Sequence, residues 1–264
     1  MAASRVFSIT GGASGIGAAL GRLLAQRGAS ALWIADKNRT HIQTLADEIR
    51  SINPATAVHT HQVDVSVAHE VDDWINTVVQ AGPLHGAANV AGLAQAVASS
   101  SSSSRAAPTI LQETDESWRR VMGVNIDGVF YCTRAQVRAM KAVMPPRSHC
   151  SIVNVASMVA LFHVGDTYGY ATSKAACAYF STSVSKDVYP WGIRVNSVSP
   201  GNVETPMMDD ILPSTSPEQR RQLIRASGMD PMHPSSVARV IAWLLSEDSL
   251  DVTGVNLPVG QGYP

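Results

Sequence analysis

The stretch Thr10-Gly11-Gly12-Ala13-Ser14-Gly15-Ile16-Gly17 stands between a short apolar run and an amphipathic helical pattern. Glycine lets a backbone turn tightly and approach a pyrophosphate closely, and the N–H groups and positive dipole end of the following helix attract negative charge. The spacing Gly-x3-Gly-x-Gly differs from the common fingerprint Gly-x-Gly-x-x-Gly, but the apolar run and the helix supply the context that such a motif requires. The stretch therefore predicts a strand, a phosphate-binding turn and a helix. The alternative is a tight turn without a ligand.

Outward from this stretch, short apolar runs alternate with longer helical patterns along the whole chain. The expected strands are Val6 to Ile9, Ala31 to Ala35, Val58 to Val65, Gly86 to Val90, Ser151 to Ala156, Ile193 to Ser199 and Val252 to Pro258. The expected helices are Ile16 to Arg27, Thr40 to Ile52, Val67 to Ala81, Glu116 to Val143, Tyr170 to Val188 and Ser236 to Ser246. Strict alternation requires crossover connections, which give a parallel sheet covered on both faces. We predict an α/β protein with one doubly wound parallel sheet, a Rossmann fold, in which seven strands are flanked by helices in a single domain over residues 1–264.

The composition favours one intracellular domain. The chain has 264 residues, of which 45% are hydrophobic, so a large core can form without disulfides. The three cysteines, Cys132, Cys150 and Cys177, are odd in number and lack paired spacing, which argues against a disulfide framework and against a cysteine-based zinc site. We expect a reducing, cytoplasmic setting.

The charge pattern argues against nucleic acid and membrane partners. The 20 basic and 21 acidic residues give a net charge of −1, which provides no basic stripe for a nucleic acid. The longest stretch without a charged residue, Ile75 to Ser104, is interrupted by polar residues, glycine and proline, unlike a transmembrane segment. The first apolar run, which begins at Val6, is typical of a strand rather than of a signal peptide.

Two segments interrupt the alternation of strands and helices. Six consecutive serines, Ser99 to Ser104, follow the fourth expected strand and indicate a surface insertion. The segment Glu204 to Met232 contains four prolines and is long for a connection inside a compact domain. Because long excursions of this kind are often lids, we expect residues 204–232 to cover a substrate.

The second expected strand is followed at once by Asp36. A carboxylate at this position accepts hydrogen bonds from the ribose 2′-hydroxyl of an adenosine and repels a 2′-phosphate, so it favours NAD over NADP. Lys37 and Arg39 follow and would soften that preference. The alternative for Asp36 is a turn or helix-cap aspartate.

Tyr170 and Lys174 lie four residues apart on one face of an expected helix, so their side chains reach the same small volume. An ammonium group about 4 Å from a phenol stabilises the ionised phenol by roughly 4 kcal/mol at an effective dielectric constant near 20. This makes Tyr170 a candidate general base for an alcohol proton. Tyr168 has Thr172 at the same offset and lacks such help. The alternative for the Tyr170–Lys174 pair is an ordinary surface contact.

Two further polar residues support the pair. Ser157 follows the fifth expected strand at its carboxyl end, where open α/β sheets bind ligands, and its hydroxyl can orient a substrate oxygen toward the phenol of Tyr170. Asn125 lies inside a long expected helix, although its amide is suited to binding water rather than to forming helix. The alternative for Asn125 is a solvent-facing or capping amide.

Six motifs occur together along the chain. They are Thr10-Gly11-x3-Gly15-x-Gly17, Asn89-Val90-Ala91-Gly92, Asn125, Ser157, Tyr170-x3-Lys174 and Pro200-Gly201-Asn202-Val203-Glu204-Thr205-Pro206. In this order and spacing, they resemble the short-chain dehydrogenase/reductase family over essentially the whole chain. Stretches such as Gly128 to Arg134 and Trp243 to Asp248 are most similar to the dehydrogenases of fungal secondary metabolism, including ergot alkaloid pathways.

The resemblance implies roles for individual residues. Tyr170 would be the general acid/base, Lys174 would favour its phenolate and hold the nicotinamide ribose, and Ser157 would bind the reacting oxygen. Asn125 would anchor a water that relays protons from Lys174 to solvent. The implied cofactor-binding residues are Gly11, Ser14, Gly15, Ile16 and Gly17 at the pyrophosphate, Asp36, Asp64 and Val65 at the adenosine, Asn89 in the central groove, Tyr170 and Lys174 at the ribose, and Val203 and Thr205 at the carboxamide.

The resemblance also implies a homotetramer built through the helices Glu116 to Val143 and Tyr170 to Val188. The chain departs from the family pattern at Val90, where Asn or Ala is usual, and at Gly260-Gln261-Gly262, where Asp-Gly-Gly is usual. Neither departure touches the proposed chemistry, but the second leaves the contacts near the carboxyl terminus open.

The main hypothesis is an NAD(H)-dependent oxidoreductase that interconverts an alcohol and a carbonyl on a small hydrophobic substrate. The apolar side chains expected around that substrate are Leu161, Phe162, Met207 and Met208. The alternatives are an NADPH-dependent ketone or imine reductase, a non-redox isomerase or cyclase using the same pocket, and a binding protein without turnover. His59 and His61 alternate on a strand, but without a third ligand they do not predict a metal site.

Overall fold

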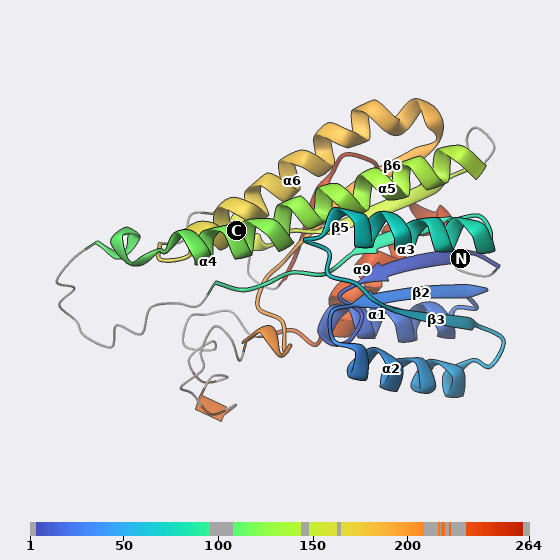
Figure 1. The fold of residues 1–264 in the computed structure, drawn as a ribbon, viewed down its shortest axis with the longest axis horizontal. Coiled ribbons are helices and arrows are strands. Elements are labelled where there is room, and N and C mark those ends of the chain that lie inside the picture. The colour runs from blue at the N-terminus through green and yellow to red at the C-terminus, as the bar shows by residue number, and fades with distance from the viewer. Residues whose placement is uncertain are drawn as a thin grey trace.

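The computed structural model describes residues 4–95, 108–143, 148–162, 165–208, 216, 218–219, 222 and 231–260. This part of the chain forms a seven-stranded sheet, all parallel, in the order β3-β2-β1-β4-β5-β6-β7 (Figure 1). The strands are β1 (Val6–Thr10), β2 (Ala31–Asp36), β3 (Ala57–Gln62), β4 (Gly86–Asn89), β5 (Cys150–Val155), β6 (Ile193–Pro200) and β7 (Asn256–Val259). The predicted doubly wound Rossmann fold is confirmed.

Helices cover both faces of the sheet (Figure 1). The α-helices are α1 (Gly15–Gln26), α2 (Arg39–Ile52), α3 (Ala68–Ala81), α4 (Asp115–Met122), α5 (Gly128–Val143), α6 (Tyr168–Val188) and α9 (Pro234–Leu244). Short 3₁₀ turns are η1 (Thr109–Gln112), η3 (Met158–Ala160), η4 (Tyr189–Trp191) and η5 (Glu247–Ser249). Helices α1, α2 and α9 pack on one face, and α3, α5 and α6 pack on the other.

The alternation of side chains along β1 shows why both faces are covered. Phe7 and Ile9 are buried in the core beneath α1 and α9. Ser8 points to the opposite face, where its hydroxyl accepts a hydrogen bond from Gln136 of α5 at 3.5 Å. Because successive side chains of a strand point to opposite faces, one short strand supplies both layers of the core.

The strand order reverses between β1 and β4, which are parallel neighbours although β2 and β3 separate them in the sequence. The hydroxyl of Thr10 at the end of β1 accepts hydrogen bonds from the N–H groups of Val90 and Ala91, at 3.1 and 3.2 Å. The loops that follow β1 and β4 are thus joined at the carboxyl edge of the sheet. In open α/β sheets, ligands bind in the crevice at this point.

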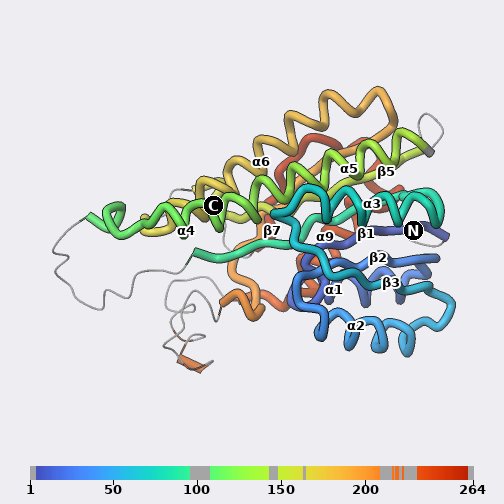
Figure 2. The backbone as a smooth tube through the Cα atoms, viewed as in Figure 1, coloured from blue at the N-terminus to red at the C-terminus, as the bar shows by residue number. Residues whose placement is uncertain are grey.

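The predicted single helix from Glu116 to Val143 is interrupted, which corrects the prediction. A wider π-helical turn, η2 (Gly123–Asp127), separates α4 from α5. The turn contains Asn125, which is fully buried and binds the backbone of Leu93 in the loop after β4. Figure 2 shows α4 and α5 following one another along one rod, with α6 beside it. Hydrophobic periodicity did not reveal the interruption, because the residues on either side keep the helical pattern.

Two strands are shorter or displaced relative to the prediction. β3 ends at Gln62 rather than Val65, because the Asp64 carboxylate accepts hydrogen bonds from the N–H and hydroxyl of Ser66 and forms a turn there. β7 begins at Asn256 rather than Val252, because the N–H of Val252 closes a turn onto the carbonyl of Ser249. Apolar residues in both turns imitate the strand pattern.

The three cysteines are buried and free of disulfides. Burial raises the pKa of Cys132 to about 12 and that of Cys150 to about 11, and it raises the pKa of Cys177 as well. A raised thiol pKa favours the neutral form, so these cysteines act as small apolar core residues.

Within the described residues, no helix is long and apolar enough to cross a membrane.

Three of the sequence features lie outside the cavity or, in whole or in part, outside the described residues. His59 and His61 stack on Trp33, with ring centroids 4.1 and 5.4 Å apart, and the part of the chain that the structure describes contains no cluster of three potential metal ligands. The serine run Ser99 to Ser104 lies outside the described residues. So does most of the segment 209–230, whereas its base is described: Val203 and Met232 form an isolated parallel bridge.

Candidate active site

A cavity of about 390 Å³ opens at the carboxyl ends of the strands. Its wall near the loops after β1 and β2 is formed by Gly11, Ser14, Gly15, Ile16, Asp36, Val90, Ala91 and Gly92. Its central wall is formed by Val155, Ala156, Ser157, Tyr170, Lys174, Pro200, Gly201, Asn202, Val203 and Thr205. Its remaining wall is formed by Ala94, Gln95, Met158, Val159, Phe162, Thr167, Met207 and Met208. Most of the predicted site residues therefore meet in one cavity.

The glycine-rich turn leaves room for a phosphate group. Gly11 has a φ of +67°, and a Cβ at this position would lie 2.6 Å from the backbone nitrogen of Ala91. Ser14, the N-cap of α1, makes no side-chain capping bond. The N–H groups of the first helical turn are therefore available to an anion, and Gly11 lets the turn pack directly against the backbone of the loop after β4. These residues fit the pyrophosphate of a dinucleotide.

Asp36 lines the cavity at the end of β2 and is held in place by the backbone. One carboxylate oxygen accepts from the N–H of Ala13 and the other from the N–H of Asn38, each at 2.9 Å. A carboxylate oxygen can accept more than one hydrogen bond, so both remain able to accept from a ribose hydroxyl. The orientation of Asp36 is set before any ligand binds.

Asp64 and Val65 do not line the cavity. The carboxylate of Asp64 forms an ion pair with the ammonium of Lys37 at 2.6 Å. Burial alone would raise the pKa of Asp64, but the hydrogen bonds from Lys37 and Ser66 outweigh it and hold that pKa below its usual value. Val65 is buried in the core under α3 and α5. The Lys37 side chain is 79% exposed, so this ion pair is a surface contact.

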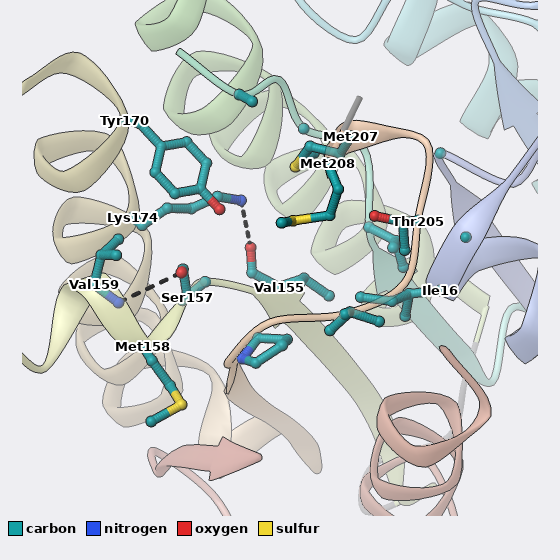
Figure 3. Close-up of a pocket in the computed structure, with 18 of the residues that line it drawn as sticks. Ile16, Val155, Ser157, Met158, Val159, Tyr170, Lys174, Thr205, Met207 and Met208 are labelled. Atoms are coloured by element: carbon teal, nitrogen blue, oxygen red, sulfur yellow. Dashed lines mark hydrogen bonds between the residues drawn. The ribbon is translucent and has the colours of Figure 1, made fainter. Parts of the chain in front are cut away.

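Tyr170, Lys174 and Ser157 converge on the centre of the cavity (Figure 3). The ammonium of Lys174 donates to the carbonyl of Val155 at 2.8 Å and lies 5.8 Å from the centre of the Tyr170 ring. The hydroxyl oxygen of Ser157 accepts from the N–H of Val159 at 3.4 Å, which leaves its proton for a ligand. Lys174 is only 3% exposed, so its charge acts close to Tyr170 in an environment with little water to screen it.

Asn125 supports this centre from behind rather than lining it. Its side-chain oxygen accepts from the N–H of Leu93 at 2.8 Å, and its amide nitrogen donates to the carbonyl of Leu93 and to the hydroxyl of Ser173, at 3.0 and 3.1 Å. Both amide donors are therefore occupied. The side chain clamps the loop after β4 onto α6, while the water relay implied for Asn125 stays a prediction.

Asn89 also lies outside the cavity lining, although the resemblance implied a place in the central groove. Its amide nitrogen donates to Asn154 of β5 at 2.8 Å and to Gln136 of α5 at 2.9 Å, and its oxygen accepts from Gln136 at 2.9 Å. The side chain thus faces the helices that cover the sheet. Its neighbours Val90 and Ala91 are the residues that reach the cavity.

The remaining predicted cofactor residues differ in position. Val203 and Thr205 line the cavity as expected, and Gly17 lies behind the turn, where a Cβ would come within 2.2 Å of the carbonyl oxygen of Gly11. The apolar end contains Phe162, Met207 and Met208, as the sequence suggested, whereas Leu161 lies outside the lining. Gln95 and Thr167 also line the cavity and were not predicted, because no motif or periodicity marks a polar residue in a loop.

Comparisons with known proteins identify the family. The family model described as short chain dehydrogenase matches residues 5–215. This chain belongs to the short-chain dehydrogenase/reductase family. A chanoclavine-I dehydrogenase of Penicillium roqueforti is 49% identical and one of Claviceps purpurea is 51% identical, each over 99% of this chain and 98% of the relative. The enzyme of the same name from Aspergillus fumigatus is 47% identical with the same coverage.

Solved structures of the short-chain dehydrogenase/reductase family share this fold. Levodione reductase superposes with a TM-score of 0.87 at 25% identity, covering 99% of this chain and 98% of that one. NAD+-bound xylitol dehydrogenase superposes with a TM-score of 0.85 at 26% identity and covers 99% of both chains. Membership of the family makes the chain an NAD(P)-dependent oxidoreductase acting on CH–OH groups, and the resemblance predicted from the sequence is confirmed.

Replacing Gly17 with alanine tests the close packing of the phosphate-binding turn. In Gly17→Ala, the new methyl group collides with the carbonyl of Gly11. We therefore expect the free energy of unfolding, measured in urea, to fall by about 1 to 3 kcal/mol and NAD(H) binding to weaken. The matched control is Gly21→Ala in the same helix, where a Cβ would meet the end of the Ile49 side chain at 3.2 Å. Equal effects of the two substitutions on cofactor binding would contradict this role of Gly17.

Proposed function

We propose that this protein is an NAD(H)-dependent dehydrogenase of an alkaloid alcohol of the chanoclavine-I type. The observation that carries the proposal is the convergence of Tyr170, Lys174 and Ser157 beside an apolar wall in one cavity. Three fungal relatives named chanoclavine-I dehydrogenase, 47 to 51% identical over nearly the full length, support the substrate class.

The mechanism follows from the positions of the three side chains. The hydroxyl of Ser157 donates a hydrogen bond to the substrate oxygen and directs it toward the phenol of Tyr170. Tyr170 in its phenolate form takes the hydroxyl proton, and the nearby ammonium of Lys174 stabilises that form. When bound, the nicotinamide cofactor supplies the acceptor for the hydride that leaves the carbon bearing this hydroxyl. In the reverse direction, Tyr170 returns the proton to the carbonyl oxygen.

Lys174 has a second part in this mechanism. Its hydrogen bond to the carbonyl of Val155 holds the ammonium at the end of β5, where the nicotinamide ribose hydroxyls would reach it. Asn125 holds the loop beside Lys174 through Leu93, and we propose that a water at this turn passes the proton onward to solvent. The carboxamide of the nicotinamide would lie against Val203 and Thr205.

The preference for NAD rests on Asp36. Its carboxylate is oriented by two backbone N–H groups at the adenosine end, where it would accept from the ribose hydroxyls and repel a 2′-phosphate. Lys37, the nearest cation in the sequence, is paired with Asp64. Because this ion pair is exposed and therefore weak, the preference rests on Asp36 and not on the pairing of Lys37.

The substrate end is adaptable and apolar. Met158, Met207, Met208 and Phe162 supply side chains that fit irregular hydrophobic shapes. Met207 and Met208 begin the segment 204–232, which we propose closes over the substrate as a lid. The bridge between Val203 and Met232 would anchor both ends of that lid.

We further propose a homotetramer in the cytoplasm. On α5 and α6, Phe130 is 40% exposed and Tyr179 is 79% exposed, and the guanidinium of Arg134 lies 5.0 Å above the Phe130 ring. Burial of such aromatic groups between copies of this chain is favourable, and closed symmetric assemblies are the commonest outcome. The free, buried cysteines support a reducing compartment.

The proposal is tested by mixing the protein with chanoclavine-I and a panel of hydrophobic secondary and allylic alcohols in the presence of NAD+, and by following nicotinamide absorbance. We expect turnover that falls roughly 10²- to 10⁴-fold in Tyr170→Phe, because the general base is lost. The matched control is Tyr168→Phe, whose phenol bonds Thr109 and lies outside the cavity lining.

Retention of turnover in Tyr170→Phe would overturn the assignment of the base. Conversion of substrate without a change in nicotinamide absorbance would instead indicate the non-redox isomerase or cyclase. If there is neither a change in nicotinamide absorbance nor conversion of substrate, a binding protein without turnover is favoured.

The cofactor preference has its own test. In Asp36→Ser, we expect weaker NAD binding by about 1.5 to 3 kcal/mol, because hydrogen bonds to a charged group are lost, together with tighter NADP binding. The measurement is a fluorescence titration with each cofactor. Asp47→Ser, on the exposed side of α2, makes the same change in charge away from the cavity. Tighter binding of NADP than NAD by the unmodified protein would contradict the assigned role of Asp36.

The assembly is tested by sedimentation at micromolar concentration. We expect a tetramer, and a smaller species for Tyr179→Glu, because a carboxylate replaces an aromatic ring at the proposed contact between copies. Ile52→Glu, at the end of α2, introduces the same charge on a residue 38% exposed and should leave the tetramer intact. Sedimentation of the unmodified protein as a monomer would overturn the proposal.

A further inference from the structure

The helix that carries Tyr170 begins without a cap of its own. Thr167, the N-cap of α6, makes no side-chain capping bond. The N–H groups of the first three helical residues have no partner within the helix, because the first intrahelical bond runs from Ala171 to the carbonyl of Thr167. The third of these groups is the backbone N–H of Tyr170. A hydrogen-bond partner for it therefore acts on the residue proposed as the general base.

Gln95, in the loop after β4, provides that cap from a distant part of the sequence. Its side-chain oxygen accepts from the N–H of Tyr170 at 3.0 Å. Gln95 is only 7% exposed and lines the cavity beside Tyr170. A Cβ at Gly169 would lie 3.4 Å from the same oxygen, at ordinary van der Waals contact, so the amide packs directly against this turn. A buried amide thus replaces the usual serine or threonine cap.

Glu113 decides which way the amide of Gln95 points. The amide nitrogen donates to the Glu113 carboxylate, which lies between η1 and α4. An ionised carboxylate only accepts hydrogen bonds, so it selects the orientation in which the Gln95 nitrogen faces it and the oxygen faces Tyr170. The opposite orientation would set two donors against each other at Tyr170 and two acceptors against each other at Glu113.

We propose that Gln95, oriented by Glu113, is a positioning residue that sets the general base Tyr170 in its productive place through the first turn of α6. This inference rests on the proposed function. It adds a chain of contacts from Glu113 through Gln95 to Tyr170 that connects three segments: the loop after β4, the start of α4 and the start of α6. The phenol lies on the same residue as the capped N–H, so loosening of the turn displaces the phenol from Ser157 and Lys174.

An exchange of the two side chains gives a sharp test. In Gln95→Glu, two carboxylates face each other, and we expect kcat to fall roughly 10- to 100-fold at neutral pH, because small misplacements of reacting groups cost about this much. The loss should diminish as the pH falls, since protonation of one carboxyl restores a donor between them. In the double variant Gln95→Glu/Glu113→Gln, the carboxylate at 95 accepts from Tyr170 and from the amide at 113. We expect kcat and the pH profile of the unmodified protein to return.

Amide hydrogen exchange of Tyr170 provides a readout that does not depend on activity. We expect faster exchange and lower thermal stability in Gln95→Glu, because two carboxylates in this partly buried contact repel each other. In the double variant we expect protection, thermal stability and NAD(H) affinity to return toward those of the unmodified protein. The matched control is Thr109→Val, which removes the hydrogen bonds of the Thr109 hydroxyl to the Asp166 carboxylate and to the phenol of Tyr168, the latter at 2.8 Å, but leaves Gln95 in place. It should keep kcat and the exchange rate at Tyr170.

The outcomes separate this inference from the proposed function. Absence of turnover by the unmodified protein with every alcohol overturns the proposed function. Normal turnover by the unmodified protein together with an unaffected kcat in Gln95→Glu, or a double variant no better than the single one, overturns the positioning role alone. An equal loss in Thr109→Val also overturns it, because any loosening of the start of α6 would then suffice.

Discussion

The parallel pairing of β1 with β4 is the constraint on which the site depends. It brings Gly11 and Ala91, 80 positions apart in the chain, so close that no side chain fits between them. The Thr10 hydroxyl joins the two loops further by accepting from two N–H groups of the second. The strand order reverses here, so the helices that follow leave in opposite directions and the crevice between them stays open for a ligand.

On the other side of this crevice, α6 carries Tyr170 and Lys174, the proposed catalytic residues, and contacts from other segments hold the helix there. The buried ammonium of Lys174 donates to the end of β5, and Asn125 in the π turn binds both Ser173 and the loop after β4. Burial of polar and charged groups is costly unless they are hydrogen-bonded, so each of these contacts is required by the burial itself. Tyr170, the proposed general base, is positioned as a consequence of satisfying the polar groups around it.

Hydrophobic periodicity predicted the strands and helices closely where it was strong. β1 and α1 end within a residue or two of the prediction, because burial on both faces of a parallel sheet produces continuous apolar runs. The pattern failed at the π turn around Asn125 and at the ends of β3 and β7, where apolar residues such as Val65 and Val252 lie in turns. Local hydrogen bonds decide those boundaries, and composition does not record them.

By itself, the sequence determined the Rossmann fold, and it pointed to Tyr170, Lys174 and Ser157 as candidate site residues, which line one cavity in the structure, because spacing along one helix and position after one strand are local properties. Only the tertiary structure decided that Asn89 and Asn125 face the packing rather than the cavity, and that Gln95 caps the helix of Tyr170. These contacts join segments 32 to 75 residues apart. Their partners are selected by the packing of the whole chain, so no local pattern of residues encodes them.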